Sequence, residues 1–110
     1  MELSKDYLME QLGAFNDVEN MRTNSGGDAS NQFKLYFQHG VLFKSYDSII
    51  AIRYDSTIKD ENLKNKTVIG CDYDYSRTTG RYRNQFLNEG VAETRAKIKD
   101  GTYIYCEDLK

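Results

Sequence analysis

The fold is decided by an alternating stretch, Phe33-Lys34-Leu35-Tyr36-Phe37-Gln38-His39-Gly40-Val41-Leu42-Phe43. Apolar side chains at every second position over residues 33–37 are typical of a half-buried strand. A second apolar run, residues 41–43, follows the short connection His39-Gly40, and a short connection that contains glycine is typical of a β-hairpin. The stretch therefore predicts two antiparallel strands joined by a tight turn.

The chain that follows this hairpin predicts further strands and two helices. Strands are expected over residues 48–54, 67–71 and 102–106, with a polar loop at residues 55–66. The first of them has apolar residues at both parities, which indicates burial on both faces or a central place in the sheet. Helices are expected over residues 81–87, capped by Thr78 or Thr79, and over residues 91–99, after the helix breaker Gly90. The pattern predicts an α+β domain, with a mostly antiparallel sheet of four to five strands and helices packed on one face.

The N-terminal residues predict an acidic arm outside that core. Ser4 is a candidate N-cap, and Leu8, Leu12 and Phe15 recur at helical spacing, so a helix is expected from Lys5 to about residue 18. Residues 1–21 hold five carboxylates against one lysine, a net charge of −4. Ser25-Gly26-Gly27 is typical of a linker. We therefore expect one domain over residues 1–110, with a helical arm (1–21), a linker-like loop (22–31) and an α+β core (32–110) that folds without the arm.

The inventory of reactive residues predicts no enzyme, no cofactor and no metal site. The chain has one histidine and two cysteines, without the paired spacing that metal ligands need. Asp72-x-Asp74-x-Ser76 is similar to the opening of a calcium loop, but Arg77 and Arg83 occupy the positions where glycine and a bidentate glutamate are needed. No phosphate-binding glycine loop occurs.

The same composition predicts a cytoplasmic protein. Apolar residues make up 39% of the chain and charged residues 29%, with a formal net charge of −2, which is typical of a globular domain. No apolar stretch approaches the length of a membrane span, and no signal peptide is recognisable, so no membrane partner is expected. Cys71 and Cys106 lie at predicted strand ends and are expected to be unbridged packing thiols.

One segment, residues 72–86, interleaves arginine with tyrosine, and we call it the Arg/Tyr segment. Its candidate binding residues are Tyr73, Tyr75, Arg77, Arg81, Tyr82 and Arg83. Such residues can hold phosphates and stack on bases, or they can anchor a protein interface. They can also be scaffold, with Asp72 and Asp74 neutralising two arginines while the tyrosines close the core. The sequence leaves these three readings open.

Two motifs carry a resemblance to a known group of proteins. They are Ser45-Tyr46-Asp47-Ser48-Ile49-Ile50-Ala51 and Asp74-Tyr75-Ser76-Arg77-Thr78-Thr79-Gly80-Arg81-Tyr82-Arg83-Asn84-Gln85-Phe86-Leu87. With the charged helix and short strand after them, they resemble a family of small phage and prophage proteins of Gram-positive bacteria, over residues from about 33 to 105. That family has tryptophan at the position of Tyr73, usually lacks residues 1–31 and carries no established catalytic residues.

The resemblance implies a phage accessory protein in the cytoplasm of the host cell. Small phage proteins of this kind bind and disable host machinery, CRISPR–Cas effectors included, or regulate phage genes. The expected function is therefore non-enzymatic binding of a host or phage protein, such as a nucleic-acid-bound effector complex, with inhibition of a host defence nuclease as its most specific form. The alternative is a nucleic-acid-binding regulator that uses the Arg/Tyr segment.

Overall fold

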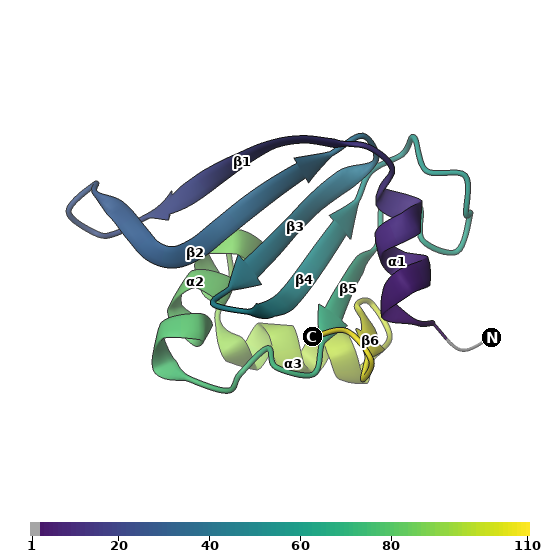
Figure 1. Ribbon diagram of the computed structural model, residues 1–110. Helices are drawn as coiled ribbons and strands as arrows, with labels where there is room; N and C mark the ends of the chain where they lie inside the picture. Colours follow the sequence, from purple (N-terminus) through teal and green to yellow (C-terminus); the bar gives the residue numbers. More distant parts are fainter. Residues whose placement is uncertain (1–2) are drawn as a thin grey trace.

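The computed structural model describes residues 3–110, which form three helices and six strands (Figure 1). In chain order these elements are α1 (Lys5–Leu12), β1 (Phe15–Arg22), β2 (Asp28–Phe37), β3 (Gly40–Ser45), β4 (Ser48–Tyr54), β5 (Thr67–Gly70), α2 (Arg77–Leu87), α3 (Val91–Lys99) and β6 (Ile104–Cys106). The strands lie in one sheet in sequence order, β1-β2-β3-β4-β5-β6. All neighbours are antiparallel except β5 and β6, which are parallel. The predicted α+β class and mostly antiparallel sheet are confirmed, with more strands than expected.

The central hairpin forms as the alternation predicts. Strands β2 and β3 pair from Gln32 with Ser45 to Phe37 with Gly40, so the connection itself is Gln38-His39. Gly40 is the first residue of β3. Glycine is needed at this position because a Cβ atom would lie 2.6 Å from the backbone oxygen of Arg53 on the neighbouring strand. Strand β4 is buried on both faces, as its two-sided apolar pattern predicts.

The sheet has two faces with separate cores. On one face, which we call the helix-pair face, buried strand residues pack with the inward side chains of α2: Phe43, Ile50, Ala51 and Ile69 with Tyr82, Phe86 and Leu87. On the other, the α1 face, Leu8 and Leu12 of α1 pack on Leu42, Ile52, Tyr54 and Val68, together with Ile58 and Leu63 of the 55–66 loop. Figure 1 shows α2 and α3 on one side of the sheet and α1 at the other, near the β4–β6 end.

The expected helical arm is wrong beyond Leu12. Helix α1 ends at Gly13, which has φ +77°, a conformation that glycine adopts without a Cβ penalty. Residues 15–22 form β1 instead. Of the linker expected over residues 22–31, only residues 23–27 form a turn, in which the N–H of Thr23 donates to the carbonyl of Gly27; residues 28–31 belong to β2. Irregular pairing near both ends of β1 lets a strand carry apolar residues at the i, i+3 spacing that predicted a helix.

The second helix begins earlier than predicted. Ser76, rather than Thr78 or Thr79, is the N-cap of α2, and its Oγ accepts a hydrogen bond from the N–H of Thr79 at 3.1 Å. Most of the Arg/Tyr segment is therefore helical, and Arg81 and Arg83 lie in mid-helix. Helix α3 has the predicted bounds, and β6 is confined to three residues.

Candidate functional site

The Arg/Tyr segment leaves β5, crosses a turn over residues 71–76 and continues as α2. The structure divides its six candidate residues into two groups. Tyr82 and Arg83 are buried, and Tyr73 is half-buried with its ring edge-on to that of Tyr105, 6.5 Å between centroids. Tyr75, Arg77 and Arg81 are exposed. The six residues therefore do not form one surface.

Arg83 is part of the scaffold. Its side chain is 2% exposed, and one of its terminal nitrogens donates to the Tyr73 carbonyl at 2.7 Å and to Oδ1 of Asp74 at 3.1 Å. The other terminal nitrogen donates to Oδ1 of Asn84 at 2.9 Å. A buried charge needs such partners, because its desolvation costs several kcal/mol. Arg83 thus fixes the turn before α2 onto the helix, which is one of the readings that the sequence left open.

Asp74 joins this turn to α3 as well. Its second oxygen accepts a hydrogen bond from Arg95 at 2.5 Å. Burial alone raises the pKa of Asp74, but the hydrogen bonds from Arg83 and Arg95 outweigh it and hold the pKa below the ordinary value. The carboxylate of Asp74 is therefore ionised at neutral pH and pairs with both arginines. Arg83 is buried in this pairing, whereas the side chain of Arg95 is 58% exposed and the group of three keeps one net positive charge.

The exposed remainder of the segment is small and cationic. Tyr75 is 55% exposed, and Arg77 and Arg81 stand four residues apart on α2, so they share one side of the helix. Within residues 3–110 neither arginine makes an ion pair. This trio is the part of the segment that can meet an anionic or aromatic ligand.

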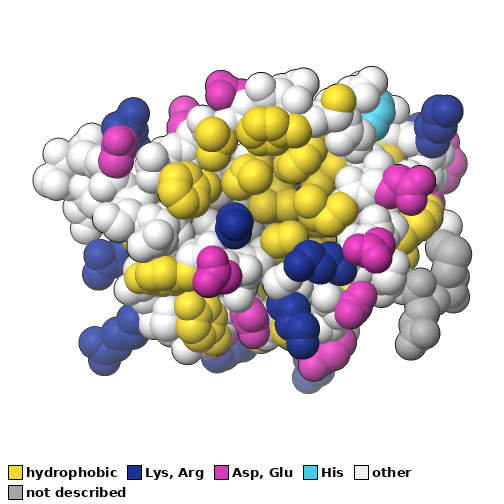
Figure 2. Space-filling model, viewed as in Figure 1, with side chains coloured by type: hydrophobic (Ala, Val, Ile, Leu, Met, Phe, Trp, Pro, Cys, Tyr) yellow, Lys and Arg dark blue, Asp and Glu magenta, His cyan; other side chains and the backbone are white. Residues whose placement is uncertain are grey.

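A larger feature lies on the α1 face of the sheet, where β1, β2 and the C-terminal end of β3 have no helix over them; α1 packs on β3 at Leu42. Residues that pair directly across antiparallel strands project to the same face, and the register places Phe15 beside Phe37, Val18 beside Leu35, and Phe33 beside Lys44. Phe15 and Val18 are 54% and 50% exposed. We call this surface the open patch; its members are Phe15, Val18, Phe33, Leu35, Phe37 and Lys44. Figure 2 shows hydrophobic side chains gathered over this part of the sheet.

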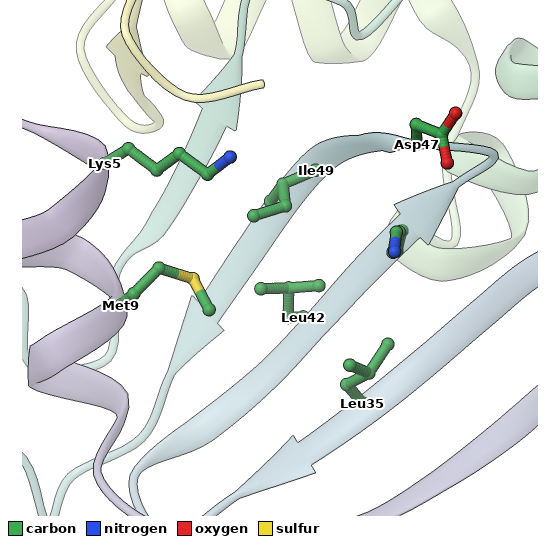
Figure 3. A pocket seen from close by; sticks show the side chains of 7 residues that line it. Lys5, Met9, Leu35, Leu42, Asp47 and Ile49 are labelled. Atoms are coloured by element: carbon green, nitrogen blue, oxygen red, sulfur yellow. The ribbon is translucent and has the colours of Figure 1, made fainter.

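A groove runs between the open patch and α1 (Figure 3). Its volume is about 200 Å³, and it is lined by Lys5, Met9, Leu35, Leu42, Lys44, Asp47 and Ile49. Lys5 and Met9 project from α1, whereas Leu35, Leu42 and Ile49 lie on the strands. Among the described residues, the side chains of Lys5 and Lys44 have neither an ion pair nor a hydrogen bond. The floor of the groove is therefore apolar, and its margins carry two lysines without an ion pair and one carboxylate, Asp47.

Two observations on residues 3–110 concern metal ligands and the histidine. No group of three metal-ligating side chains comes together within residues 3–110. Nδ1 of His39 lies 2.7 Å from the hydroxyl of Thr57, which itself donates to Asp55. Because that hydroxyl proton points to the carboxylate, the histidine nitrogen must donate, so His39 does not act as a base on Thr57.

Cys71 and Cys106 are both free; Cys106 is buried and Cys71 is half-buried, where burial chiefly raises its pKa. A raised thiol pKa lowers the thiolate fraction and with it the reactivity. None of the helices in the described part is long and apolar enough to cross a membrane.

Sequence reasoning missed the open patch, although the signal was present. The alternation of Phe33, Leu35 and Phe37 correctly predicts one apolar face, but it does not tell whether another element covers that face. Phe15 and Val18 were assigned to a helix, so their alignment with that alternation was lost. The two sets meet only through the register of β1 against β2.

Comparison with known proteins gives one match. A family model described as "Family of unknown function (DUF8033)" matches residues 17–102. The matched range runs from within β1 to just before β6, so it includes most of the open patch and all of the Arg/Tyr segment. No curated protein and no solved structure matches the chain.

Proposed function

We propose that the chain, which belongs to the Family of unknown function (DUF8033), acts without catalysis by binding another protein through the open patch. The observation that carries this proposal is the uncovered apolar surface over β1–β3. Contiguous apolar patches on monomeric proteins mark interaction sites more often than scattered exposed residues do. The patch also contains three phenylalanines, Phe15, Phe33 and Phe37, and aromatic residues are enriched in the cores of protein interfaces.

The test is a binding comparison between two matched aromatic variants. Phe15→Ser removes an exposed ring from the open patch, and Tyr75→Ser removes a similarly exposed ring from the Arg/Tyr segment. Each variant is used as bait in host-cell lysate, with and without nuclease treatment, and retained proteins are quantified by mass spectrometry. We expect Phe15→Ser to lose a protein partner that Tyr75→Ser retains, whether or not nuclease is added. Retention of every partner by Phe15→Ser would refute the proposal.

A second candidate function is nucleic-acid binding through Tyr75, Arg77 and Arg81. It is supported by two unpaired arginines on one side of α2 beside an exposed ring. Phosphate contacts release counterions, so the logarithm of the binding constant falls with the logarithm of salt concentration in proportion to the contacts made. A salt series with single-stranded and duplex oligonucleotides tests this candidate. Arg77→Gln combined with Arg81→Gln should reduce the slope by about two.

The resemblance to phage and prophage proteins supports a narrower form of the main proposal. In that form the partner is a host defence protein in the cytoplasm, such as a nuclease effector, and occupation of its surface blocks its action. Expression of the chain in a host whose nuclease restricts a phage should restore plaque formation, and Phe15→Ser should not. If the native chain does not change plaque formation, the host-defence form of the proposal is rejected. The lysate experiment then decides whether the chain binds another protein.

A further inference from the structure

The α1 face has room for a second helix beside α1. Six strands about 4.8 Å apart make a sheet roughly 24 Å across, and a helix with its side chains is about 10 Å wide. Helix α1 has eight residues and lies near the β4–β6 end, where the 55–66 loop also packs. The β1–β3 half is left free, whereas two helices lie against the opposite face.

Helix α1 is an example of how a helix packs on this face. Leu8 and Leu12, four residues apart, are fully buried against the sheet, and the hydroxyl of Tyr54 donates to the Leu8 carbonyl at 2.6 Å. The groove beside it offers an equivalent apolar floor in Leu35, Leu42 and Ile49. An amphipathic helix with apolar residues at i, i+3, i+4 and i+7 fits such a floor.

Charge decides what the polar side of that helix must carry. Lys5 and Lys44 line the groove, and Asp47 at the β3–β4 turn is the one acidic side chain among its lining residues. Two cations with no partner in the described chain, set beside apolar surface, favour carboxylates on the occupant. A second copy of the chain is a poorer fit, because its own open patch and groove would bring Lys44 and Lys5 again, two lysines without an ion pair.

Strand addition at the sheet edge is disfavoured by β1 itself. The pairing of β1 with β2 is irregular between Phe15 and Asp17 and again between Asn20 and Arg22. Irregularities of this kind twist an edge strand and protect it from further pairing. The free surface is thus the face of the β1–β3 segment and not its edge.

We infer that the open patch and its groove bind an amphipathic, acidic helix of the partner protein, laid on the sheet beside α1. The inference rests on the proposed function and names the chemistry of its partner. The apolar side of the bound helix covers Val18 and Leu35, and its glutamate or aspartate side chains meet Lys5 and Lys44.

The test uses two synthetic helical peptides that differ only in charge. Both carry leucine at positions i, i+3, i+4 and i+7; the flanking positions are glutamate in one and lysine in the other. Affinity is measured by fluorescence anisotropy, and the site is mapped by amide chemical shifts. The acidic peptide should bind about ten-fold more tightly and shift the amides of β2 and β3. Lys44→Glu should reverse the preference, and the matched control Lys99→Glu, an exposed change on α3, should leave it unchanged.

Several outcomes overturn the inference. They are equal affinity for the two peptides, no binding of either, shifts confined to α2, and peptide binding that a single-stranded oligonucleotide displaces. A dimer in sedimentation analysis that Val18→Lys dissociates would assign the patch to a second copy. These outcomes can be told apart from failure of the proposed function. If Phe15→Ser loses a protein partner in lysate but the acidic peptide is not preferred, the inference is rejected and the proposed function stands.

Discussion

The two faces of the sheet are built from similar residues but are covered very differently. On the helix-pair face, Phe43 is 0% exposed under α2, with its ring stacked on that of Phe86 at 5.7 Å. On the α1 face, Phe15 is 54% exposed although its ring lies 5.6 Å from that of Phe37. Burial of Phe43 stabilises the folded state, whereas the exposed ring of Phe15 adds little to that stability. The difference shows which apolar residues stabilise the fold and which ones are free to bind.

The largest expected effect comes from opening the helix-pair core. Phe43→Ala removes a fully buried ring and should lower the free energy of unfolding by about 3–5 kcal/mol, since the cavity cannot collapse. Phe15→Ala, its matched control, should change that free energy by no more than about 0.5 kcal/mol. Urea denaturation followed by circular dichroism measures both. Equal losses would mean that the open patch is part of the core.

The stability of the core on the α1 face should depend on the N-terminal helix α1. Leu8→Ala should cost about 3 kcal/mol, because Leu8 is fully buried among Leu12, Ile52 and Tyr54. We therefore expect the N-terminal segment to be needed for stability, whereas the sequence predicted that residues 32–110 fold without it. Thermal unfolding of the chain with residues 1–13 deleted provides a second measurement. A cooperative transition at the native temperature would restore the view of a dispensable arm.

A third change separates the two arginines of α2. Arg83→Gln should cost about 2 kcal/mol, because it removes the charged donor from the Tyr73 carbonyl and from Oδ1 of Asp74, which then keeps only Arg95. Arg81→Gln, two residues away and exposed, should fall within about 0.5 kcal/mol. Chemical denaturation of the single variants gives the comparison directly. If both variants unfold alike, Arg83 does not hold the turn before α2.

Much of the fold, but less of the candidate site, could be predicted from the sequence. Helix α3, the central hairpin and the two-sided burial of β4 follow from periodicity and from glycine positions. Strand β1 could not be predicted, because Phe15 and Val18 fit a helix and an irregular strand equally well until β2 supplies a pairing register. Tertiary pairing overrides local spacing in such a case.

The site depended on the phase of one helix. With the N-cap at Ser76, the inward side of α2 carries Thr79, Tyr82, Arg83 and Phe86. Arg81, two residues before Arg83, lies on the outward side. A sequence pattern that starts the helix later does not tell which arginine is buried. Exposure of the open patch could not be predicted either, because it depends on which other elements of the chain pack over β1 and β2.

A smaller effect is expected at the junction of α2 and α3, where Glu89 is 3% exposed. It accepts hydrogen bonds from Lys97 and Thr94, both at 2.6 Å, and from Tyr103 at 2.9 Å. Burial raises the pKa of Glu89, but the hydrogen bonds from these three donors outweigh it and lower the pKa overall.

A carboxylate with a lowered pKa in the folded protein stabilises it above the unfolded pKa, and that contribution disappears as pH falls through the folded pKa. Glu89→Gln should therefore cost about 1–2 kcal/mol at neutral pH and approach the native chain in acid. Denaturation midpoints from about pH 7 to about pH 3 measure the convergence. A constant difference over that range would mean that the charge of Glu89 contributes nothing.

The smallest expected effect is a gain in stability, and it lies at the polar margin of the helix-pair face. Gln32 is 0% exposed, and within the described chain neither its amide nitrogen nor its oxygen has a hydrogen-bond partner. The neighbouring Ser45 instead bonds to Thr79 at 3.0 Å. A buried unpaired polar group costs roughly 1–3 kcal/mol, so Gln32→Met, which keeps the length of the side chain, should raise the free energy of unfolding by about 1 kcal/mol.

In a domain of this size about 1 kcal/mol corresponds to roughly 4 °C in melting temperature, which calorimetry resolves. Gln38→Met, an exposed control in the hairpin turn, should leave the melting temperature unchanged. Destabilisation by Gln32→Met would show that the amide holds a buried water, because such waters bridge polar groups that are otherwise unsatisfied and are costly to remove. In that case polar contacts, as well as α2 and α3, would close the helix-pair face at Gln32.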